Sequence, residues 1–234
     1  MNYLANMLTI FSLLCGFVSI IFSLESHFTF ASWAIILSVI FDGLDGQIAR
    51  KNPLPSEFGK ELDSLVDVVS FGIAPSILGY IFIYSDFYLL TTLTLFIYLL
   101  CSVMRLAKYN ITPKEKLVSY FYGLPTTVSG GILASFILIY RKGKEVSLLP
   151  QPIPFIFIFL VVLLAFLMVS RIRYFNLDGL QQLFGKKTKL IVLILVILLI
   201  FAAFLRKAGV TLFALFLIYL LFSPFAVKRL SHST

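Results

Sequence analysis

The sequence predicts an all-α, polytopic membrane bundle of about eight transmembrane helices. Of its 234 residues, 60% are hydrophobic and only 13% are charged, and the mean hydropathy is +1.01. Soluble domains average about 45–50% apolar and about 25% charged residues. Crossing a bilayer takes about 20 mostly apolar residues per helix, and stretches near that length fill most of the chain. We therefore expect a single membrane domain over residues 1–234.

The connections between the predicted spans range from 2 residues, at 85–86 and 207–208, to 19 residues, at 171–189. In chain order the spans cover residues 7–24, 30–49, 63–84, 87–107, 122–140, 153–170, 190–206 and 209–227. The first span lacks the basic start of a cleavable signal and is expected to be retained. Proline-rich turns at 52–55 and 149–154 separate later spans. Within the third span, Ser70, Gly72 and Pro75 weaken the helical hydrogen bonds and predict a kink.

Basic residues are concentrated on one side of this topology. Fourteen of the 19 Lys and Arg residues fall on the side of the N-terminus and five on the other side. Cytoplasmic loops carry an excess of basic residues, so we expect a multi-pass protein of the cell membrane with both termini in the cytoplasm. The net charge of +8 then reflects topology and anionic lipid rather than nucleic acid. Cys15 and Cys101 lie in apolar spans and are expected to be buried thiols.

Four of the 11 acidic residues lie inside predicted spans, where a carboxylate is costly and marks function. Asp42 and Asp45 are three residues apart near the end of the second span, and Asp63 and Asp67 are four apart near the start of the third. Each spacing places a pair on one helix face. The turn between the spans centres near Leu54, so the hairpin brings both pairs to matching depth on the cytoplasmic side.

Four ionised carboxylates in a low-dielectric environment repel one another unless cations are present. Carboxylate oxygens suit a hard ion such as Mg²⁺, Mn²⁺ or Ca²⁺, and the sequence has no Cys or His cluster for zinc. Two such ions would clamp a diphosphate during phosphoryl transfer. Gly46 and Ala49 share the face of the first pair, and Gly59 lies one turn before Asp63, so small residues leave room for a ligand. A structural ion-pair network that includes Arg50, or a cation or proton pathway, also accounts for four intramembrane acids.

The acidic residues belong to a longer pattern that occupies residues 42–67. It reads D-x-x-D-G-x-x-A-R-x8-G-x3-D-x3-D, and its fixed positions are Asp42, Asp45, Gly46, Ala49, Arg50, Gly59, Asp63 and Asp67. With this pattern, matched without a departure, the chain resembles the CDP-alcohol phosphatidyltransferase family. Asn6 and Thr9 fall where that family has a polar Asn-x-x-Thr pair on its first helix. The resemblance strongly favours a transferase over a cation or proton transporter.

The resemblance implies a metal-dependent membrane enzyme that uses a CDP-activated lipid and releases CMP. Two Mg²⁺ or Mn²⁺ ions would be held by Asp42, Asp45, Asp63 and Asp67. The CDP-lipid would be bound by Asn6, Thr9, Asp42, Asp45, Gly46, Ala49, Arg50 and Gly59. Asp67 would also be the catalytic base that takes the proton of the acceptor hydroxyl. Membrane lipid and a second copy of the chain, in a homodimer, are the implied partners, and no cofactor beyond metal is expected.

Sequences that flank the motif resemble the serine-transferring branch of the family. They are residues 62–75, 105–110 and 121–125. L-serine is therefore the expected acceptor, and a glycerol phosphate or inositol phosphate transferase is the alternative. The serine carboxylate needs a cation at the cytoplasmic rim, and the candidates are Arg105, Lys108, Arg171, Arg173 and Lys186. The base role of Asp67 is favoured by its position at the deeper end of its pair, provided that the helix stays regular as far as Ser70.

Overall fold

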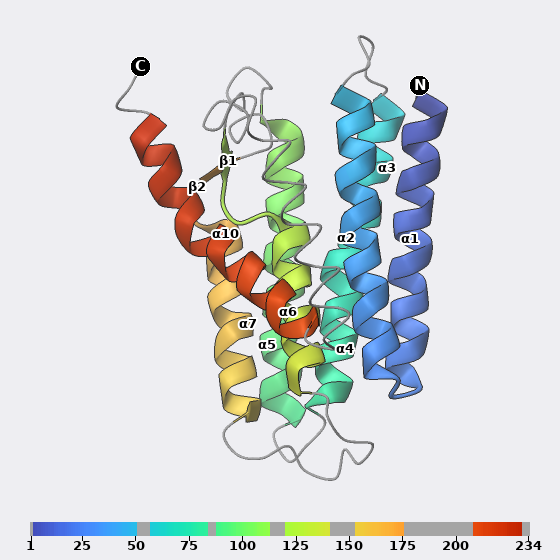
Figure 1. Ribbon diagram of the computed structural model, residues 1–234, viewed down its shortest axis with the longest axis vertical. Coiled ribbons are helices and arrows are strands. Elements are labelled where there is room, and N and C mark those ends of the chain that lie inside the picture. Colours follow the sequence, from blue (N-terminus) through green and yellow to red (C-terminus); the bar gives the residue numbers. More distant parts are fainter. Residues whose placement is uncertain are drawn as a thin grey trace.

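The computed structural model describes residues 2–50, 57–83, 88–112, 120–140, 153–175 and 208–230. Over these residues the chain is a helical bundle with one short two-stranded ribbon (Figure 1). The helices are α1 (Asn2–Leu24), α2 (Phe28–Arg50), α3 (Glu57–Asp67), the π-helix η1 (Val68–Ile73), α4 (Ala74–Phe82), α5 (Tyr88–Ile111), α6 (Thr126–Tyr140), α7 (Ile153–Val169) and α10 (Ala208–Leu230). The ribbon pairs β1 (Tyr120–Tyr122) with β2 (Arg173–Phe175) in antiparallel register.

The predicted all-α membrane architecture is confirmed. Five helical stretches are long and apolar enough to cross a bilayer, namely Tyr3–Leu24, Phe28–Ala49, Glu57–Phe82, Tyr88–Ile111 and Ala208–Phe225. The helices α6 and α7 are apolar but shorter, at 15 and 17 residues. These seven elements correspond to seven of the eight predicted spans. The remaining predicted span, 190–206, lies outside the described residues, so the total of eight spans stays a prediction.

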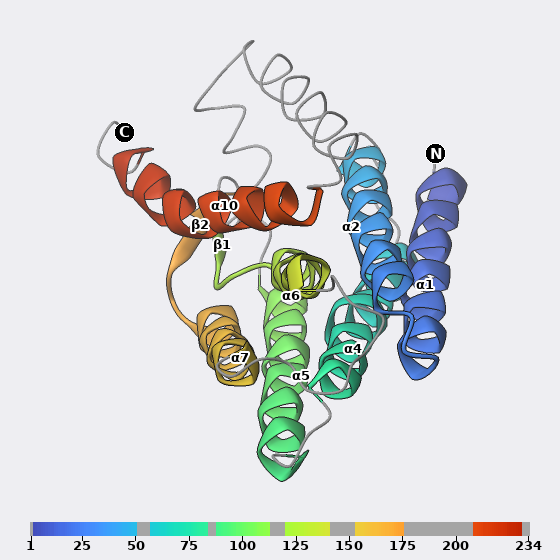
Figure 2. The ribbon, with the colours of Figure 1, turned by 60° about the horizontal axis from the view of Figure 1, so that its bottom comes forward.

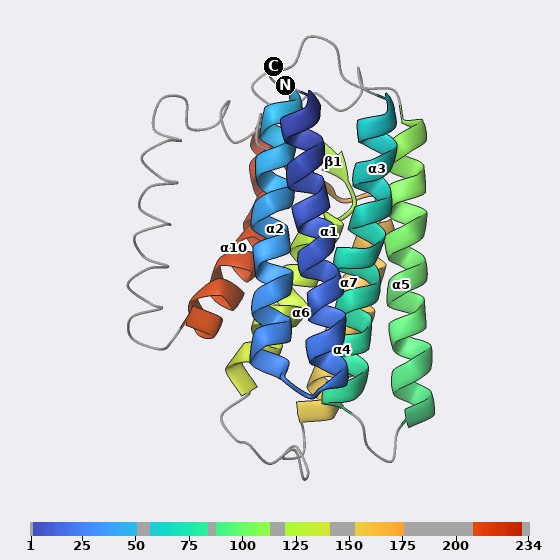
Figure 3. The ribbon, with the colours of Figure 1, turned by 90° about the vertical axis from the view of Figure 1, so that its right-hand side faces the viewer.

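Helix α6 occupies the interior of the bundle. Helices α1 and α2 form an antiparallel hairpin, the run α3–η1–α4 packs beside it, and α5, α7 and α10 complete the arrangement around α6 (Figures 2 and 3). The start of α1 and the end of α10 lie at the same end of the bundle, where the ribbon and the start of α3 also lie (Figure 1). Residues far apart in sequence therefore meet at this end.

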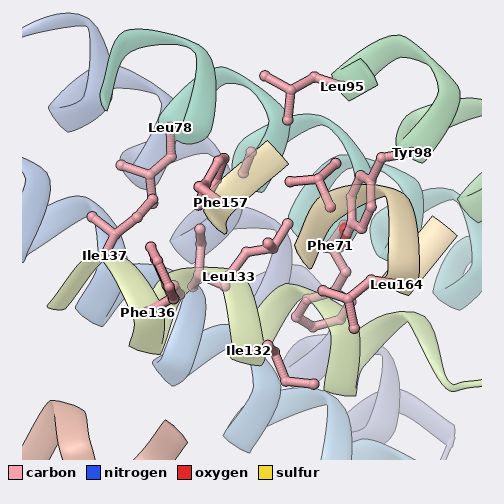
Figure 4. Close-up of a cluster of buried hydrophobic side chains, with 14 of the residues drawn as sticks. Phe71, Leu78, Leu95, Tyr98, Ile132, Leu133, Phe136, Ile137, Phe157 and Leu164 are labelled. Atoms are coloured by element: carbon pink, nitrogen blue, oxygen red, sulfur yellow. The ribbon is translucent and has the colours of Figure 1, made fainter. Parts of the chain in front are cut away.

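The side chains of α6 pack closely against the neighbouring helices. Ile132, Leu133 and Ile137 of α6 are fully buried against Phe71 of η1 and Phe157 of α7 (Figure 4). In a membrane such contacts stabilise helix association by van der Waals packing, because lipid tails are as apolar as the side chains. Cys15 and Cys101 are free and only half-buried, so the expectation that both thiols are buried was wrong.

The predicted disturbance in the third span takes the form of a π-helical turn. Helix α3 ends at Asp67, and in the next segment the Ala74 N–H donates to the Val69 carbonyl, five residues back. Pro75 follows in the first turn of α4 and has no N–H to donate. The expectation that the helix stays regular as far as Ser70 was therefore wrong, because regular geometry ends at Asp67.

The predicted span 122–140 begins too early. Tyr122 ends strand β1, and α6 starts only at Thr126. Between them Gly123 has φ +78°, and a Cβ at this position would clash with the Met168 carbonyl oxygen. Only glycine fits this turn without strain. Strands of three residues carry too little alternation to be recognised in sequence, so the ribbon was not predicted.

Candidate active site

Three of the four intramembrane carboxylates lie together at the ribbon end of the bundle. Oxygen atoms of Asp42 on α2 and of Asp63 and Asp67 on α3 all lie within 4.8 Å of one another. Asp67 is buried, and its Oδ1 atom has no hydrogen-bond partner among the described residues. The sequence predicted that α2 and α3 bring two acidic pairs together, and the structure brings together one residue of the first pair and both residues of the second.

Asp45, the fourth carboxylate, is held by helix α1. Its Oδ2 atom accepts a 2.7 Å hydrogen bond from the Thr9 hydroxyl, which also lies 3.0 Å from the Ala5 carbonyl. Asp45 is buried and lies close enough to Asp63 for their charges to interact. Asn6 is half-buried and lies one helical turn before Thr9. The polar pair of α1 is therefore placed beside the acidic cluster.

The donor set fits a divalent cation. Carboxylate oxygens are the ligands that Mg²⁺ and Mn²⁺ prefer, and three carboxylates without a cation among them would repel one another strongly. A buried carboxylate oxygen with no donor, such as Oδ1 of Asp67, costs free energy unless a partner is bound. The cluster can therefore bind metal through side chains that the chain itself brings together.

The small residues of the motif lie on the same helices as the acids. Gly46 and Gly59 are half-buried, and Ala49 is exposed. Arg50 ends α2, and its side chain lies outside the described atoms. Roles for these four residues in binding a CDP-lipid stay predictions.

A second group of polar side chains, on α5 and α6, reaches Asp67. The Arg105 Nη1 atom donates to the Thr126 hydroxyl at 3.0 Å, and that hydroxyl makes a long, 3.5 Å hydrogen bond to Oδ2 of Asp67. The Arg105 Nε atom is buried and has no hydrogen-bond partner among the described residues. Helices α5 and α6 thus present one guanidinium and one hydroxyl to the carboxylate that ends α3.

Arg105 also lines a small cavity of about 40 Å³. The cavity is also lined by Lys108 and Tyr109 of α5, by Thr112 just after that helix, by Tyr122 of β1, and by Met168, Val169 and Ser170 at the end of α7. Two cations therefore face the carbonyl end of α7, which carries the partial negative charge of a helix C-terminus. The cavity and the acidic cluster are connected through Arg105, Thr126 and Asp67.

The structure separates the basic candidates for acceptor binding. Arg105 and Lys108 line the cavity, whereas Arg171 is exposed and is not part of its lining. The guanidinium of Arg173 lies 4.9 Å from the Tyr120 ring centroid and 5.7 Å from that of Tyr122. Lys186 lies outside the described residues.

Two phenols of the ribbon, Tyr120 and Tyr174, stay protonated near neutral pH. A hydrogen bond with Tyr122 raises the pKa of Tyr120, and burial raises the pKa of Tyr174. Both groups therefore remain neutral and keep their hydroxyl protons.

Sequence reasoning missed Thr126. The residue directly follows Gly123-Leu124-Pro125, a segment noted only for its resemblance to the serine branch, and it opens α6. A hydroxyl in the first turn of a helix is common as a cap, so this position carried no distinctive signal. Its proximity to Asp67, 59 residues earlier, exists only in the folded chain.

Comparison with known proteins decides the family. A model of the CDP-alcohol phosphatidyltransferase family matches residues 2–166, a range that contains the whole acidic motif as well as Arg105 and Thr126. The chain belongs to this family. The earlier inference from the motif is thereby confirmed.

Several members with named activities are similar over most of the chain. A CDP-diacylglycerol–serine O-phosphatidyltransferase of Helicobacter pylori (strain ATCC 700392 / 26695) is 33% identical, covering 92% of this chain and 87% of the relative. An archaetidylserine synthase of Methanothermobacter thermautotrophicus is 34% identical over 76% of this chain and 71% of its own length. A CDP-diacylglycerol–serine O-phosphatidyltransferase of Bacillus subtilis is 31% identical over 74% of this chain and 90% of its own.

Proposed function

We propose that the protein transfers the phosphatidyl or archaetidyl group of a CDP-activated lipid to the hydroxyl of L-serine and releases CMP. The names of the relatives from H. pylori, B. subtilis and M. thermautotrophicus support serine as the acceptor. The observation that carries the proposal is the position of Asp67. Its side chain belongs to the acidic cluster and also contacts Thr126, which Arg105 of the cavity holds.

The donor half of the site is assigned to α1, α2 and α3. Asp42, Asp45, Asp63 and Asp67 hold two divalent ions, Mg²⁺ or Mn²⁺, which when bound neutralise the charge of the diphosphate. The small side chains of Gly46, Ala49 and Gly59 admit the CDP group, and Arg50 faces its phosphates. Thr9 keeps Asp45 oriented through the 2.7 Å hydrogen bond, with Asn6 beside it.

The acceptor half is assigned to the cavity. Arg105, with Lys108, pairs with the serine carboxylate, since guanidinium groups match carboxylate geometry. The serine ammonium lies toward the carbonyl end of α7, where the helix dipole is negative. This arrangement supports a zwitterionic acceptor over glycerol phosphate or inositol phosphate, which carry no ammonium group.

The chemical step needs one proton acceptor and one leaving group. Asp67 takes the proton of the serine hydroxyl, and the serine oxygen forms a bond to the lipid-linked phosphorus. The bond from that phosphorus to the CMP oxygen breaks, and CMP leaves with the electron pair. The Thr126 hydroxyl contacts Oδ2 of Asp67 and thereby orients this carboxylate toward the serine hydroxyl.

The reaction is proposed to occur at the cytoplasmic face of the cell membrane. The start of α1, the end of α10 and the ribbon share one end of the bundle (Figure 1), and the distribution of basic residues supports a cytoplasmic position for that end. Cysteines introduced at positions 114 and 143 test this orientation. Labelling of position 143 alone by a reagent confined to the cytoplasm contradicts it. A homodimer, proposed from family resemblance, is tested by cross-linking in native membranes.

One assay tests the proposed reaction. Purified protein is given CDP-diacylglycerol or CDP-archaeol together with L-serine, glycerol 3-phosphate or inositol phosphate, and CMP is measured. Serine is expected to support release well above the rate without an acceptor, and strong chelation is expected to abolish that release. Release with glycerol 3-phosphate but not with serine contradicts the assignment of the acceptor. Full activity in chelator contradicts the metal assignment.

A further inference from the structure

Pro75, just after the π-helical turn, leaves a backbone carbonyl of that turn without the donor that a regular helix would supply. In a regular helix the Phe71 carbonyl accepts from the residue four positions later, and that residue is Pro75, which has no N–H. The Tyr98 hydroxyl of α5 donates to the Phe71 carbonyl at 2.9 Å instead. Both Tyr98 and Phe71 are fully buried, so water is excluded from this contact (Figure 4).

Tyr98 also reaches α6. Its hydroxyl oxygen lies 3.0 Å from Ser129 Oγ, and Ser129 Oγ lies 2.8 Å from the Thr126 carbonyl oxygen. The two hydroxyls have two protons for these three contacts, so two of the contacts are hydrogen bonds at any moment and the third is an oxygen–oxygen contact. The backbone of Thr126 is thereby tied to the π-helical turn through two buried side chains.

These contacts close a ring that contains the reacting carboxylate. From Asp67 the chain runs one turn to Phe71, whose carbonyl binds Tyr98. The hydroxyls of Tyr98 and Ser129 then lead to Thr126, and the Thr126 hydroxyl contacts Asp67.

Tyr98 and Arg105 are seven residues apart on α5, a spacing that places them on one face of the helix. The same tyrosine therefore fixes the helix face that carries Arg105. One hydroxyl joins the three helical segments that supply Asp67, Thr126 and Arg105.

We propose that Tyr98 is a positioning residue whose hydroxyl, through Phe71 and Ser129, fixes the alignment of Asp67, Thr126 and Arg105. This inference rests on the proposed function because turnover is one of its measurements. Asp67 is the one donor-half residue in the ring, whereas Asp42, Asp45 and Asp63 lie on α2 and the first part of α3, outside it. Loss of the hydroxyl therefore lowers kcat with serine and leaves the KM for CDP-lipid unchanged.

The test compares Tyr98→Phe, Ser129→Ala and the double variant in CMP release. Each single variant is expected to lose between about tenfold and a hundredfold in kcat, with the KM for CDP-lipid within about twofold of the original. The double variant is expected to be little worse than either single variant, because both break the same ring. Ser102→Ala is the matched control, since Ser102 is a buried α5 hydroxyl with no hydrogen-bond partner among the described residues.

A purely structural role gives a different result. If Tyr98 only satisfies the Phe71 carbonyl, Tyr98→Phe lowers the melting temperature, Ser129→Ala leaves kcat unchanged, and the inference is overturned. Additive losses in the double variant overturn it as well. Hydrogen exchange provides a measurement independent of turnover: Tyr98→Phe and Ser129→Ala should both increase exchange in residues 68–73 and 126–130, and Ser102→Ala should not. Unchanged hydrogen exchange in both variants overturns the inference, whether or not the protein is active. Absence of CMP release with serine in the wild-type protein contradicts the proposed function alone and leaves the exchange test valid.

Discussion

The donor and acceptor halves of the site are built in opposite ways. The acids of the donor half come from two consecutive helices, α2 and α3, within 26 residues, 42–67, and α1 adds Thr9 beside them. The acceptor half is assembled from the end of α5, the ribbon, the start of α6 and the end of α7. Helical periodicity is a local property. It therefore predicts which acids of the donor half share a helix face, but it gives no information about the acceptor half. Asp67 is the residue at which the two halves meet.

The largest effect is expected in the donor half. Asp63→Ala removes one member of the three-carboxylate cluster and should lower CMP release by at least about a thousandfold, because bound metal supplies several kcal/mol of transition-state stabilisation. Adding Asp42→Ala should make little further difference, since these ligands act together. Glu57→Gln is the matched control: it removes an exposed acid from the first turn of the same helix and should retain activity. Substantial activity in Asp63→Ala contradicts the metal site.

The next effect tests the residue shared by both halves. Asp67→Asn keeps an oxygen that can ligate metal but cannot accept a proton. If Asp67 is the base, turnover should fall at least about a hundredfold while CDP-lipid and metal binding persist. Metal binding and single-turnover CMP release measure the two properties separately. Recovery of most activity at high Mg²⁺ or Mn²⁺ concentration would show that Asp67 is only a ligand.

The position of Asp67 also shows where sequence reasoning stops. The four-residue spacing from Asp63 placed both acids on one face, and the structure brings them together with Asp42. The supporting argument, that the helix stays regular beyond Asp67, failed because a π-helical turn starts at Val68. Ser70, Gly72 and Pro75 indicated a distortion, but the hydroxyl that binds the Phe71 carbonyl there belongs to Tyr98 on another helix, and nothing in the local sequence indicates it.

The acceptor half could be foreseen only as a set of candidate residues. Charge and depth selected five basic side chains, and nothing in their local sequence ranked them. In the folded chain the two arginines have different environments. Arg105 on α5 donates to Thr126, whereas Arg171 follows the end of α7 and is exposed. Thr126 itself could not be foreseen, because its partner lies 59 residues away.

A smaller effect, on the KM for serine, is expected to differ between substitutions of Arg105 and Arg171. Arg105→Gln removes the cation that lines the cavity and should raise the KM for serine at least about tenfold, the usual loss for a charge-assisted hydrogen bond. The KM for CDP-lipid should change by less than about twofold, because the donor half is intact. Arg171→Gln, measured in the same assay, should leave both constants within about twofold. Equal effects of the two substitutions contradict the assignment of the cavity to serine.

The smallest effect concerns Arg173, which the sequence also offered as a serine ligand. Its guanidinium stacks on Tyr120 and Tyr122, and Tyr122 lines the cavity, so Arg173 is expected to support the cavity wall without binding serine. An exposed cation–π contact contributes about 0.5–1 kcal/mol, so Arg173→Gln should raise the KM for serine only about two- to fivefold. Tyr120→Leu breaks the same stack without removing a charge and should match it, with no further change in the double variant. If Arg173 instead binds the carboxylate directly, Arg173→Gln should approach the loss expected for Arg105→Gln while Tyr120→Leu stays mild. The ratio of those two losses therefore decides whether the ribbon is part of the wall or part of the binding site.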